Sequence, residues 1–208
     1  MTGSDQILPA WLNVSRETVN GLVALCKVIE KWTPTVNLIA KSTIREIWHR
    51  HVLDSAQLFS FAPAEARSWL DLGSGAGFPG LVIAILAKEQ RPDLKVILIE
   101  ADKRKAVFLA EAARVIGVSV SIINTRIEAA PPQKADVVSA RALTSLNGLC
   151  AYADKHLNPY GIAVFPKGLN ANAEIDAACR NWRFVINVHT SKTDPAAAIL
   201  LLRNIKDA

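Results

Sequence analysis

The sequence predicts an α/β fold in which helices cover both faces of a mostly parallel sheet, and a helical extension precedes the sheet. From residue 67 onward, short strand-like runs alternate with helical patterns. These runs are almost continuously apolar, which is typical of parallel strands buried on both faces. The last two runs have no helix between them, so we expect an antiparallel hairpin and a C-terminal antiparallel strand.

The helical extension is expected to span residues 1–65, and residues 66–208 are expected to form one compact domain. A length of 208 residues suits a single domain with an appendage. Half of the residues are apolar and 21% are charged, so the composition excludes a mainly disordered chain.

Two helical patterns occupy the extension. Residues 14–31 carry apolar side chains at helical spacing, with Ser15 as a candidate N-cap. We expect this helix to break at Trp32-Thr33-Pro34. Residues 42–60 show the second pattern, with Ser42 or Thr43 as its expected N-cap.

The elements of the domain follow in chain order. Strands are expected at 68–73, 95–100, 118–125, 135–142, 161–167, 183–190 and 196–205. Helices are expected at 79–90, 103–117, 145–157 and 171–181. Pro79 suits the first turn of the first of these helices, and Gly117 suits the end of the second.

The composition and the apolar runs indicate in which cellular compartment the protein acts. The apolar runs 81–87 and 196–202 are shorter than the ~20 residues that span a bilayer. The first ten residues lack the pattern of a signal peptide, so we expect a cytoplasmic protein without membrane association. Three scattered cysteines indicate neither a disulfide framework nor a metal site, and we expect them to be buried as small hydrophobic residues. The net charge of +5 permits an anionic partner such as nucleic acid.

A glycine-rich segment, Asp71–Gly80, follows the first predicted strand and opens a helix. Its glycines allow a sharp turn and the close approach of a ligand to helix N–H groups. The dinucleotide fingerprint GxGxxG fits only the register from Gly75, which leaves Asp71 without a role. A nucleotide-binding dehydrogenase is therefore one alternative.

The same segment also fits the pattern acidic-x-Gly-x-Gly-x-Gly, which resembles motif I of S-adenosylmethionine-dependent methyltransferases. The order of strands and helices resembles the Rossmann-like class I fold of these enzymes. Asp71 beneath the loop suits a cationic ligand. Glu100 ends the next strand, where a carboxylate can accept both ribose hydroxyls, and Glu128 follows the third strand, where the adenine edge is expected.

The acceptor is expected at the end of the fourth strand, at Ser139–Ala142. This segment lacks the Asn/Asp-Pro-Pro-Tyr motif of enzymes that methylate exocyclic adenine amines, and Asn158-Pro159-Tyr160 lies in a predicted turn before the fifth strand. No cysteine is placed to attack carbon 5 of cytosine. An acceptor that is already nucleophilic, such as N7 of guanine, needs positioning and water exclusion rather than a base.

Several strings then resemble one family in the same order. They are Asn37-Leu38-Ile39, His51-Val52-Leu53-Asp54-Ser55, GSGAGFPG at 73–80, Lys103-Arg104-Lys105, Arg126-Ile127-Glu128, Ser139 with Arg141-Ala142, and Lys167-Gly168. The family is the bacterial small-subunit ribosomal RNA N7-guanine methyltransferase, methyltransferase G, also called glucose-inhibited division protein B. The resemblance covers about residues 14–205. It implies transfer of a methyl group from S-adenosylmethionine to N7 of a guanine in the 530 loop of 16S rRNA.

The resemblance also implies site residues. The cofactor set is Asp71, Gly73, Ser74, Gly75, Gly77, Phe78, Glu100, Ala101, Asp102, Ile127, Glu128 and Arg141. The RNA-binding set is Asn37, Arg50, His51, Lys103, Arg104 and Lys167. Arg141 is the expected catalytic residue; it supports methyl transfer rather than folding, and no general base is expected. The implied partner of a monomeric enzyme is 16S rRNA or an assembly intermediate of the small subunit.

Other interpretations stay open at this point. A methyltransferase for a small molecule or a protein is the main alternative, and a non-catalytic RNA chaperone with the same fold is another. Asp54 alternatively pairs with Arg50 and His51, which are its neighbours on the predicted helix. Asn37 alternatively caps a turn, and Lys103–Lys105 alternatively form a solvated helix face.

Overall fold

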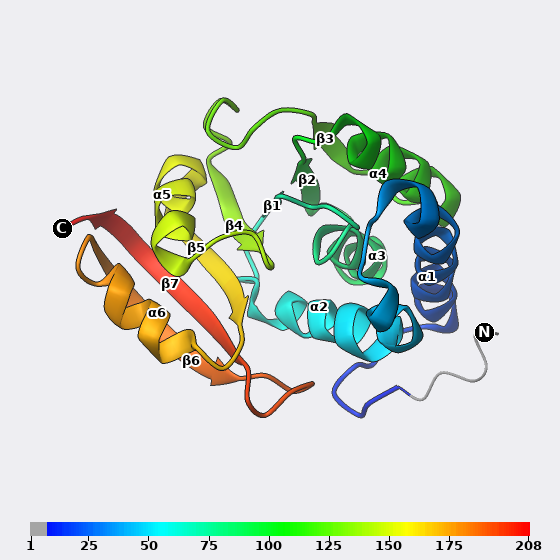
Figure 1. Cartoon of the computed structure of the whole chain (residues 1–208), viewed down its shortest axis with the longest axis horizontal. Coiled ribbons are helices and arrows are strands. Elements are labelled where there is room, and N and C mark those ends of the chain that lie inside the picture. Colours follow the sequence, from blue (N-terminus) through cyan, green and yellow to red (C-terminus); the bar gives the residue numbers. More distant parts are fainter. Residues whose placement is uncertain (1–7) are drawn as a thin grey trace.

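The computed structural model describes residues 8–208, and a seven-stranded sheet runs through its centre (Figure 1). The spatial order of the strands is β3-β2-β1-β4-β5-β7-β6. The strands are β1 (Ser68–Leu72), β2 (Lys95–Ile99), β3 (Ser121–Ile123), β4 (Ala135–Ala140), β5 (Leu157–Lys167), β6 (Trp182–Thr190) and β7 (Ala198–Asp207). Strand β7 runs antiparallel to both β5 and β6, so the predicted hairpin and the reversed C-terminal strand are confirmed.

Helices cover both faces of the sheet. They are α1 (Arg16–Val36), α2 (Asp54–Ala56), α3 (Gly80–Gln90), α4 (Lys103–Ile116), α5 (Leu146–His156) and α6 (Ala171–Ala178). Successive residues of a strand point to opposite faces, so Trp69 packs in one core with α1, α3 and α4, whereas Leu70 packs in the other core with α5. The predicted burial on both faces is confirmed.

Helix α1 is longer than the sequence predicts, and the expected break at Trp32-Thr33-Pro34 is wrong. Ser15 caps its start as predicted, since the Ser15 side chain accepts a hydrogen bond from the Thr18 N–H at 3.2 Å. The helix continues through Pro34 because Thr33 and Val36 bury their side chains in the core. It ends at Asn37, whose left-handed backbone (φ 52°) stops the helix.

The second part of the extension is irregular. It consists of the 3₁₀ turns η2 (Lys41–Glu46) and η4 (Gln57–Phe61), which flank the π-helical turn η3 (Trp48–Leu53) and the short α2. The predicted cap at residues 42–43 is wrong: the first turn starts after Ala40, and the Thr43 hydroxyl donates a hydrogen bond to the Ala40 carbonyl instead. Apolar periodicity alone does not distinguish these tighter and wider turns.

Some strand limits also differ from the prediction. Strand β3 has only three residues, and β5 starts earlier than predicted because Leu157 already pairs with Ala135. Asn158-Pro159-Tyr160 therefore lies inside β5 and not in a turn. Two cysteines are buried as expected, but Cys179 is exposed.

The extension and the sheet share one core, because α1 packs against α3 and α4. The division at residues 65 and 66 stays a prediction, and the first ten residues, read above as lacking a signal peptide, lie largely outside the described residues. Within residues 8–208, no helix combines the length and the apolar character that crossing a membrane requires.

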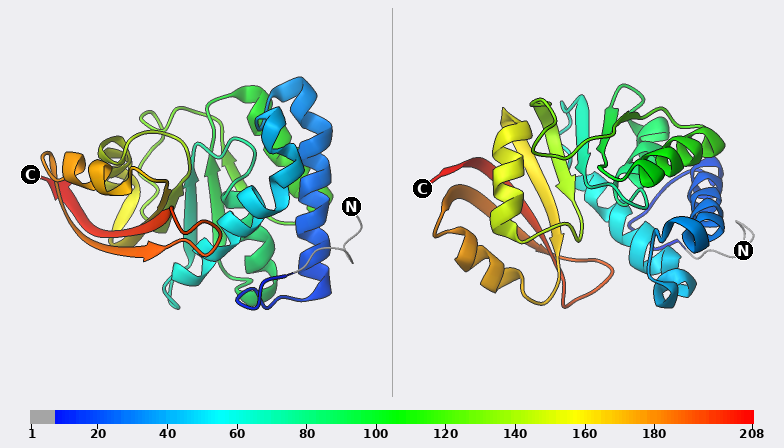
Figure 2. Two further views of the ribbon diagram at one scale, coloured as in Figure 1. Left: turned by 60° about the horizontal axis from the view of Figure 1, so that its bottom comes forward. Right: turned by 45° about the horizontal axis from the view of Figure 1, so that its top comes forward.

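Figure 2 shows that the turn between β6 and β7 reaches the segment around α2, at the sheet edge where the parallel strands end.

Candidate functional site

The glycine loop forms a tight turn between β1 and α3. Gly73, Gly75 and Gly77 all have positive φ angles of 64°, 52° and 87°, which L side chains rarely adopt. The N–H groups of Gly73 and Ser74 donate hydrogen bonds to the Ile99 carbonyl at 2.9 and 3.1 Å. These bonds hold the loop over the end of β2, at the edge where ligands bind in open α/β sheets.

The three later glycines of the loop serve different purposes. A Cβ atom at Gly77 would lie 2.5 Å from the Leu81 side chain, and one at Gly80 would lie 2.3 Å from Leu98. Both positions therefore need glycine for packing. A Cβ atom at Gly75 would meet only the Gly73 carbonyl oxygen, at 3.7 Å. Gly75 thus borders open space in which a ligand can approach the backbone.

Glu100 lies directly beside this loop, as the sequence predicts. Its Oε2 accepts a hydrogen bond from the Gly75 N–H, and its Oε1 accepts one from the Asp102 N–H, both at 2.8 Å. The side chain is buried, so the carboxylate has a fixed position at the end of β2. Each oxygen keeps further lone-pair capacity for a ligand hydroxyl.

Asp71 lies beneath the loop but does not face the open space. It is fully buried, and its carboxylate accepts hydrogen bonds from the Ser139 hydroxyl at 2.8 Å and the Gly80 N–H at 3.2 Å. Burial raises the pKa of Asp71 to about 6, and these hydrogen bonds limit the rise. The interpretation of Asp71 as a ligand contact is therefore corrected: it joins β1, β4 and α3 below the loop.

The residues after β3 lie at the far end of the same edge. Ile127 is buried, and its carbonyl accepts a hydrogen bond from His156 at 3.2 Å. The Glu128 carboxylate is exposed and accepts a hydrogen bond from the Tyr152 hydroxyl, which lowers the pKa of Glu128. Glu128 is thus already engaged by a protein donor at the place where the adenine edge is expected.

Phe78 links the loop to the extension. The His51 ring stacks on the Phe78 ring, with centroids 5.1 Å apart, and the Arg141 guanidinium lies 5.2 Å from the centroid of the same ring. Phe78 is buried, so it supports these two side chains rather than presenting an open face to a ligand.

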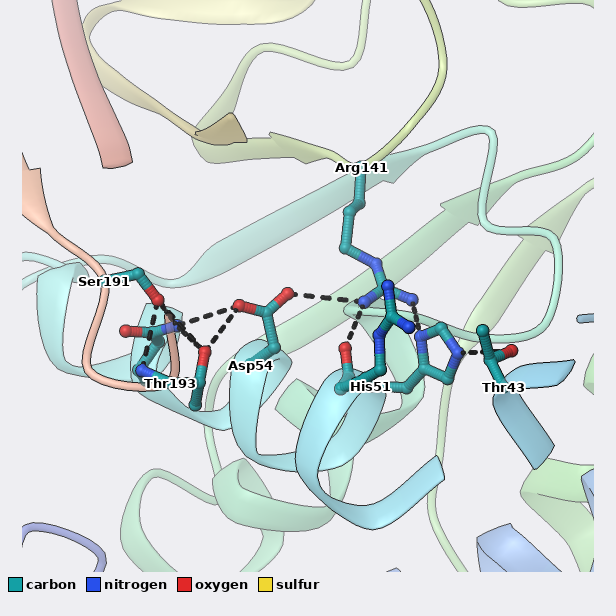
Figure 3. Close-up of polar contacts among 8 residues, drawn as sticks. Thr43, His51, Asp54, Arg141, Ser191 and Thr193 are labelled. Atoms are coloured by element: carbon teal, nitrogen blue, oxygen red, sulfur yellow. Dashed lines mark hydrogen bonds and ion pairs between the residues drawn. The ribbon is translucent and has the colours of Figure 1, made fainter. Parts of the chain in front are cut away.

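Arg141 follows β4 and binds the extension through three hydrogen bonds (Figure 3). Its Nη1 donates to the Asp54 carboxylate at 3.3 Å and to the Arg50 carbonyl at 3.0 Å, and its Nη2 donates to His51 Nδ1 at 2.7 Å. Arg141 therefore joins the extension to the sheet, a structural contact that the expectation of a purely catalytic residue did not include. The alternative pairing of Asp54 with Arg50 and His51 is also wrong, because Arg50 pairs with Glu46 instead.

These contacts fix the protonation of His51. Since a guanidinium only donates, His51 Nδ1 accepts, and Nε2 carries the proton toward the Thr43 hydroxyl at 3.2 Å. Burial, and to a lesser extent the nearby Arg141 and Arg50 charges, together lower the pKa of His51 to about 4. His51 is neutral near pH 7 and both of its ring nitrogens are occupied.

A cleft of about 690 Å³ opens beside Arg141, at the ends of β4 and β5. Charged side chains of both signs line it. The lining residues are Glu46, His49, Arg50, Asp54, Ala140, Arg141, Ala142, Thr144, Leu149, Pro166, Lys167, Gly168, Glu174, Thr193, Asp194 and Ala197. The cleft is large enough for a nucleobase-sized group and adjoins the glycine loop through Arg141 and Phe78.

The predicted RNA-binding residues divide into two groups. Arg50, Lys103 and Arg104 are exposed, as RNA contact requires, and Asn37 is exposed where it caps α1. Lys167 differs: its Nζ lies 2.7 Å from Glu174 and donates to the Thr144 carbonyl at 3.0 Å, and its side chain is only 10% exposed. Lys167 lines the cleft with its charge already paired, and its role in RNA binding stays a prediction.

Three cations, Lys103 to Lys105, begin α4, although the helix dipole disfavours positive charge at that end, and a carboxylate lies beside them. Asp102 caps this helix, accepting hydrogen bonds from the N–H groups of Arg104 at 2.8 Å and Lys105 at 3.3 Å. The Arg104 N–H bond contributes most to the lowered pKa of Asp102. Asp102 and its neighbour Ala101 thus form the turn that begins α4, beside Glu100.

Sequence reasoning missed two features of the cleft. Ala142 has a positive φ of 51°, a strained backbone directly after Arg141, and no composition signal marks it. Gln57 is fully buried and binds residues near position 191, far away in the chain. A polar residue amid the apolar pattern of residues 42–60 was the available signal for Gln57.

Comparison with known proteins identifies the family. The family model described as rRNA small subunit methyltransferase G matches residues 18–196. The ribosomal RNA small subunit methyltransferase G of Cereibacter sphaeroides is 51% identical over 93% of this chain and 94% of its own length. The protein of the same name from Rhodospirillum centenum is 46% identical over 94% of this chain and 88% of its own length.

Solved structures confirm the fold. A cofactor-bound protein from MTB, Rv0187, matches with a TM-score of 0.58 and 16% identity, over 93% of this chain and 92% of that one. TYW2 of M. jannaschii in complex with AdoMet matches with a TM-score of 0.54 and 14% identity, over 78% of each chain. The predicted Rossmann-like methyltransferase fold is confirmed, and the methyltransferase family model makes the dehydrogenase alternative wrong. The chain belongs to the rRNA small subunit methyltransferase G family.

Proposed function

We propose that this protein transfers the methyl group of S-adenosylmethionine to N7 of a guanine in the 530 loop of 16S rRNA, and that it acts in the cytoplasm as a monomer. The observation that carries the proposal is the cleft beside Arg141, at the end of β4, in a chain of this family. In this fold the end of the fourth parallel strand lies next to the reactive end of the cofactor site.

The residues present fit the cofactor. The open space beside Gly75 accommodates its methionyl part, and the buried Glu100 carboxylate accepts hydrogen bonds from its ribose hydroxyls. We assign the adenine ring to the position beside Ile127, an apolar residue at the far end of the same edge. S-adenosylmethionine supplies an electrophilic methyl group bound to a sulfonium centre.

The chemistry of the acceptor agrees with the groups near Arg141. N7 of guanine has an in-plane lone pair and no proton, so its methylation needs no general base. His51 and Asp54, the titratable groups that contact Arg141, both have their acceptor atoms occupied by protein donors. Arg141, held beside the cleft, can orient either the cofactor carboxylate or guanine O6 through its remaining N–H groups.

RNA binding is assigned to exposed cations on the same side of the molecule. Arg50 lines the cleft, and Lys103 and Arg104 begin α4 directly after the Glu100 turn. Exposed lysine and arginine bind phosphates and position a nucleic acid without reading its sequence. The protein therefore combines a phosphate-binding rim with a cleft for one base.

Nucleoside mass spectrometry of 16S rRNA from cells with and without the gene tests this proposal. We expect 7-methylguanosine in the 530-loop fragment to disappear when the gene is deleted and to return when the wild-type gene is restored. Restoration by a Glu100→Ala variant serves as the control for cofactor use and should fail. Full 7-methylguanosine in the deletion strain would refute the proposed substrate.

A further inference from the structure

Asp54 makes contacts in two directions (Figure 3). Its Oδ2 lies 3.3 Å from Nη1 of Arg141, and its Oδ1 accepts hydrogen bonds from the Thr193 hydroxyl and the Gln57 side-chain amide, both at 3.0 Å. Its side chain is only 20% exposed. One carboxylate thus binds Arg141 after β4 and the turn between β6 and β7.

Gln57 also binds the turn between β6 and β7. Its Nε2 donates to the Ser191 hydroxyl at 2.9 Å, and its Oε1 accepts a hydrogen bond from the Lys192 N–H at 2.8 Å. The side chain is 1% exposed. A buried amide that loses such partners leaves polar atoms unsatisfied, so this contact holds one arrangement of the turn.

These contacts connect opposite walls of the cleft. Arg141 and Arg50 line one wall, and Thr193 and Asp194 line the wall formed by the β6–β7 turn. Asp54 also lines the cleft and touches residues of both walls. Asp54, together with Gln57, therefore joins parts of the cleft lining that come from distant segments of the chain.

Arg141 keeps binding capacity despite its contacts. Within residues 8–208, its hydrogen bonds use three N–H groups: two on Nη1, toward Asp54 and Arg50, and one on Nη2, toward His51. A guanidinium carries five N–H donors in a rigid plane. Once Asp54 fixes that plane, the directions of the other two donors are fixed as well.

We propose that Asp54, supported by Gln57, is a positioning residue for methyl transfer: it orients Arg141 and sets the width of the cleft that receives the target base. This inference rests on the proposed function of the cleft. Asp54 acts through Arg141 and the β6–β7 turn. Its negative charge also balances the Arg141 cation in a site where only a fifth of either side chain is exposed.

Single-turnover methylation of small subunits from cells that lack the gene tests the proposal. Asp54→Asn keeps the shape of the side chain and removes its charge, so we expect the rate at saturating S-adenosylmethionine to fall about tenfold or more. The rate is read at saturating S-adenosylmethionine, so that a change in cofactor affinity does not enter it. Asp93→Asn is the matched control, because Asp93 pairs with Arg67 on the exposed surface, and its rate should equal that of the wild type.

A double-mutant cycle separates positioning from mere stability. If Asp54 acts through Arg141, adding Asp54→Asn to Arg141→Ala should slow the reaction no further. Independent, multiplying losses would overturn the proposal. So would an Asp54→Asn enzyme that unfolds at lower temperature but reacts at the wild-type rate when folded. If Asp54→Asn does not fold, Thr193→Val removes one hydrogen bond to the same carboxylate and should still slow the reaction.

A failure of the proposed function can be distinguished from a failure of the positioning role of Asp54. If the wild-type enzyme produces no 7-methylguanosine, the proposed function is refuted, and the four proteins of the cycle can still be compared by urea unfolding. A coupling free energy between Asp54 and Arg141 would support the contact on which positioning depends. Additive unfolding free energies would overturn it.

Discussion

A substitution at Gly75 distinguishes the loss of cofactor affinity from the cost of backbone strain. Its φ of 52° and the open space at its Cβ position mean that Gly75→Ala clashes with nothing in the protein. The substitution still places an L residue in the left-handed region, at a cost of about 1–2 kcal/mol. For a chain of this size that corresponds to a fall in melting temperature of roughly 2–8 °C.

Gly117→Ala is the matched control for this strain. Gly117 ends α4 with a φ of 68°, and a Cβ atom there would meet only the end of the flexible Lys88 side chain, at 3.6 Å. Both alanine variants should therefore lose similar stability. Only Gly75→Ala places a methyl group in the space that the cofactor needs.

Calorimetric titration with S-adenosylmethionine, together with thermal unfolding, measures both effects. We expect Gly75→Ala to weaken binding about tenfold or more, or at least ~1.4 kcal/mol, and Gly117→Ala to bind like the wild type. Unchanged affinity in folded Gly75→Ala would refute the placement of the cofactor. Equal losses of affinity in both variants would show that strain, not contact, is responsible.

Three further predictions follow from the same geometry. Arg141→Ala should lower the free energy of unfolding by about 2–3 kcal/mol and should also slow single-turnover methylation. This loss is smaller than for a fully buried ion pair, because about a fifth of each side chain is exposed. An unchanged melting temperature would contradict the bridging role of Arg141. The ring of His51 should titrate near pH 4 by NMR. Arg141→Ala should move this midpoint upward toward 6.5, because the substitution removes a nearby positive charge. A midpoint near 6.5 in the wild type would refute the neutral, hydrogen-bonded state of His51. Because the folded pKa of His51 is lowered, its contribution to stability is present above pH 6.5 and is lost as pH falls toward 4. Lys103→Ala with Arg104→Ala should reduce the slope of RNA affinity against salt concentration by about 2 without changing cofactor affinity, whereas a wild-type slope would assign both residues to a solvated helix face.

The sheet and the glycine loop were predictable because local signals and packing agree there. Apolar strands separated by amphipathic helices indicated a parallel sheet, and three closely spaced glycines indicated the loop. Glu100 was also found from its place at the end of a strand. The burial of Asp71 was not evident, because its partners Ser139 and Gly80 come from different elements.

The acceptor side was less predictable because it depends on contacts between distant segments. One alternative paired Asp54 with neighbours on its own helix, but its partners include Arg141 and Thr193, 87 and 139 residues away. The π-helical turn changes which side chains share a face, so regular helical spacing misplaced this part of the chain. The ion pair of Lys167 with Glu174 was not predicted, because the sequence does not specify the position of the helix that carries Glu174.

A methyl-transfer assay with the purified protein tests the central claim most directly. The assay measures transfer of a labelled methyl group from S-adenosylmethionine to small subunits that lack the modification. Nucleoside and fragment mass spectrometry then locate the labelled product. The account predicts label in 7-methylguanosine at one guanine of the 530 loop, formed by the wild-type protein and not by a Gly75→Val variant. Label at another atom of the base, at another position of the RNA, or in ribosomal protein would contradict it.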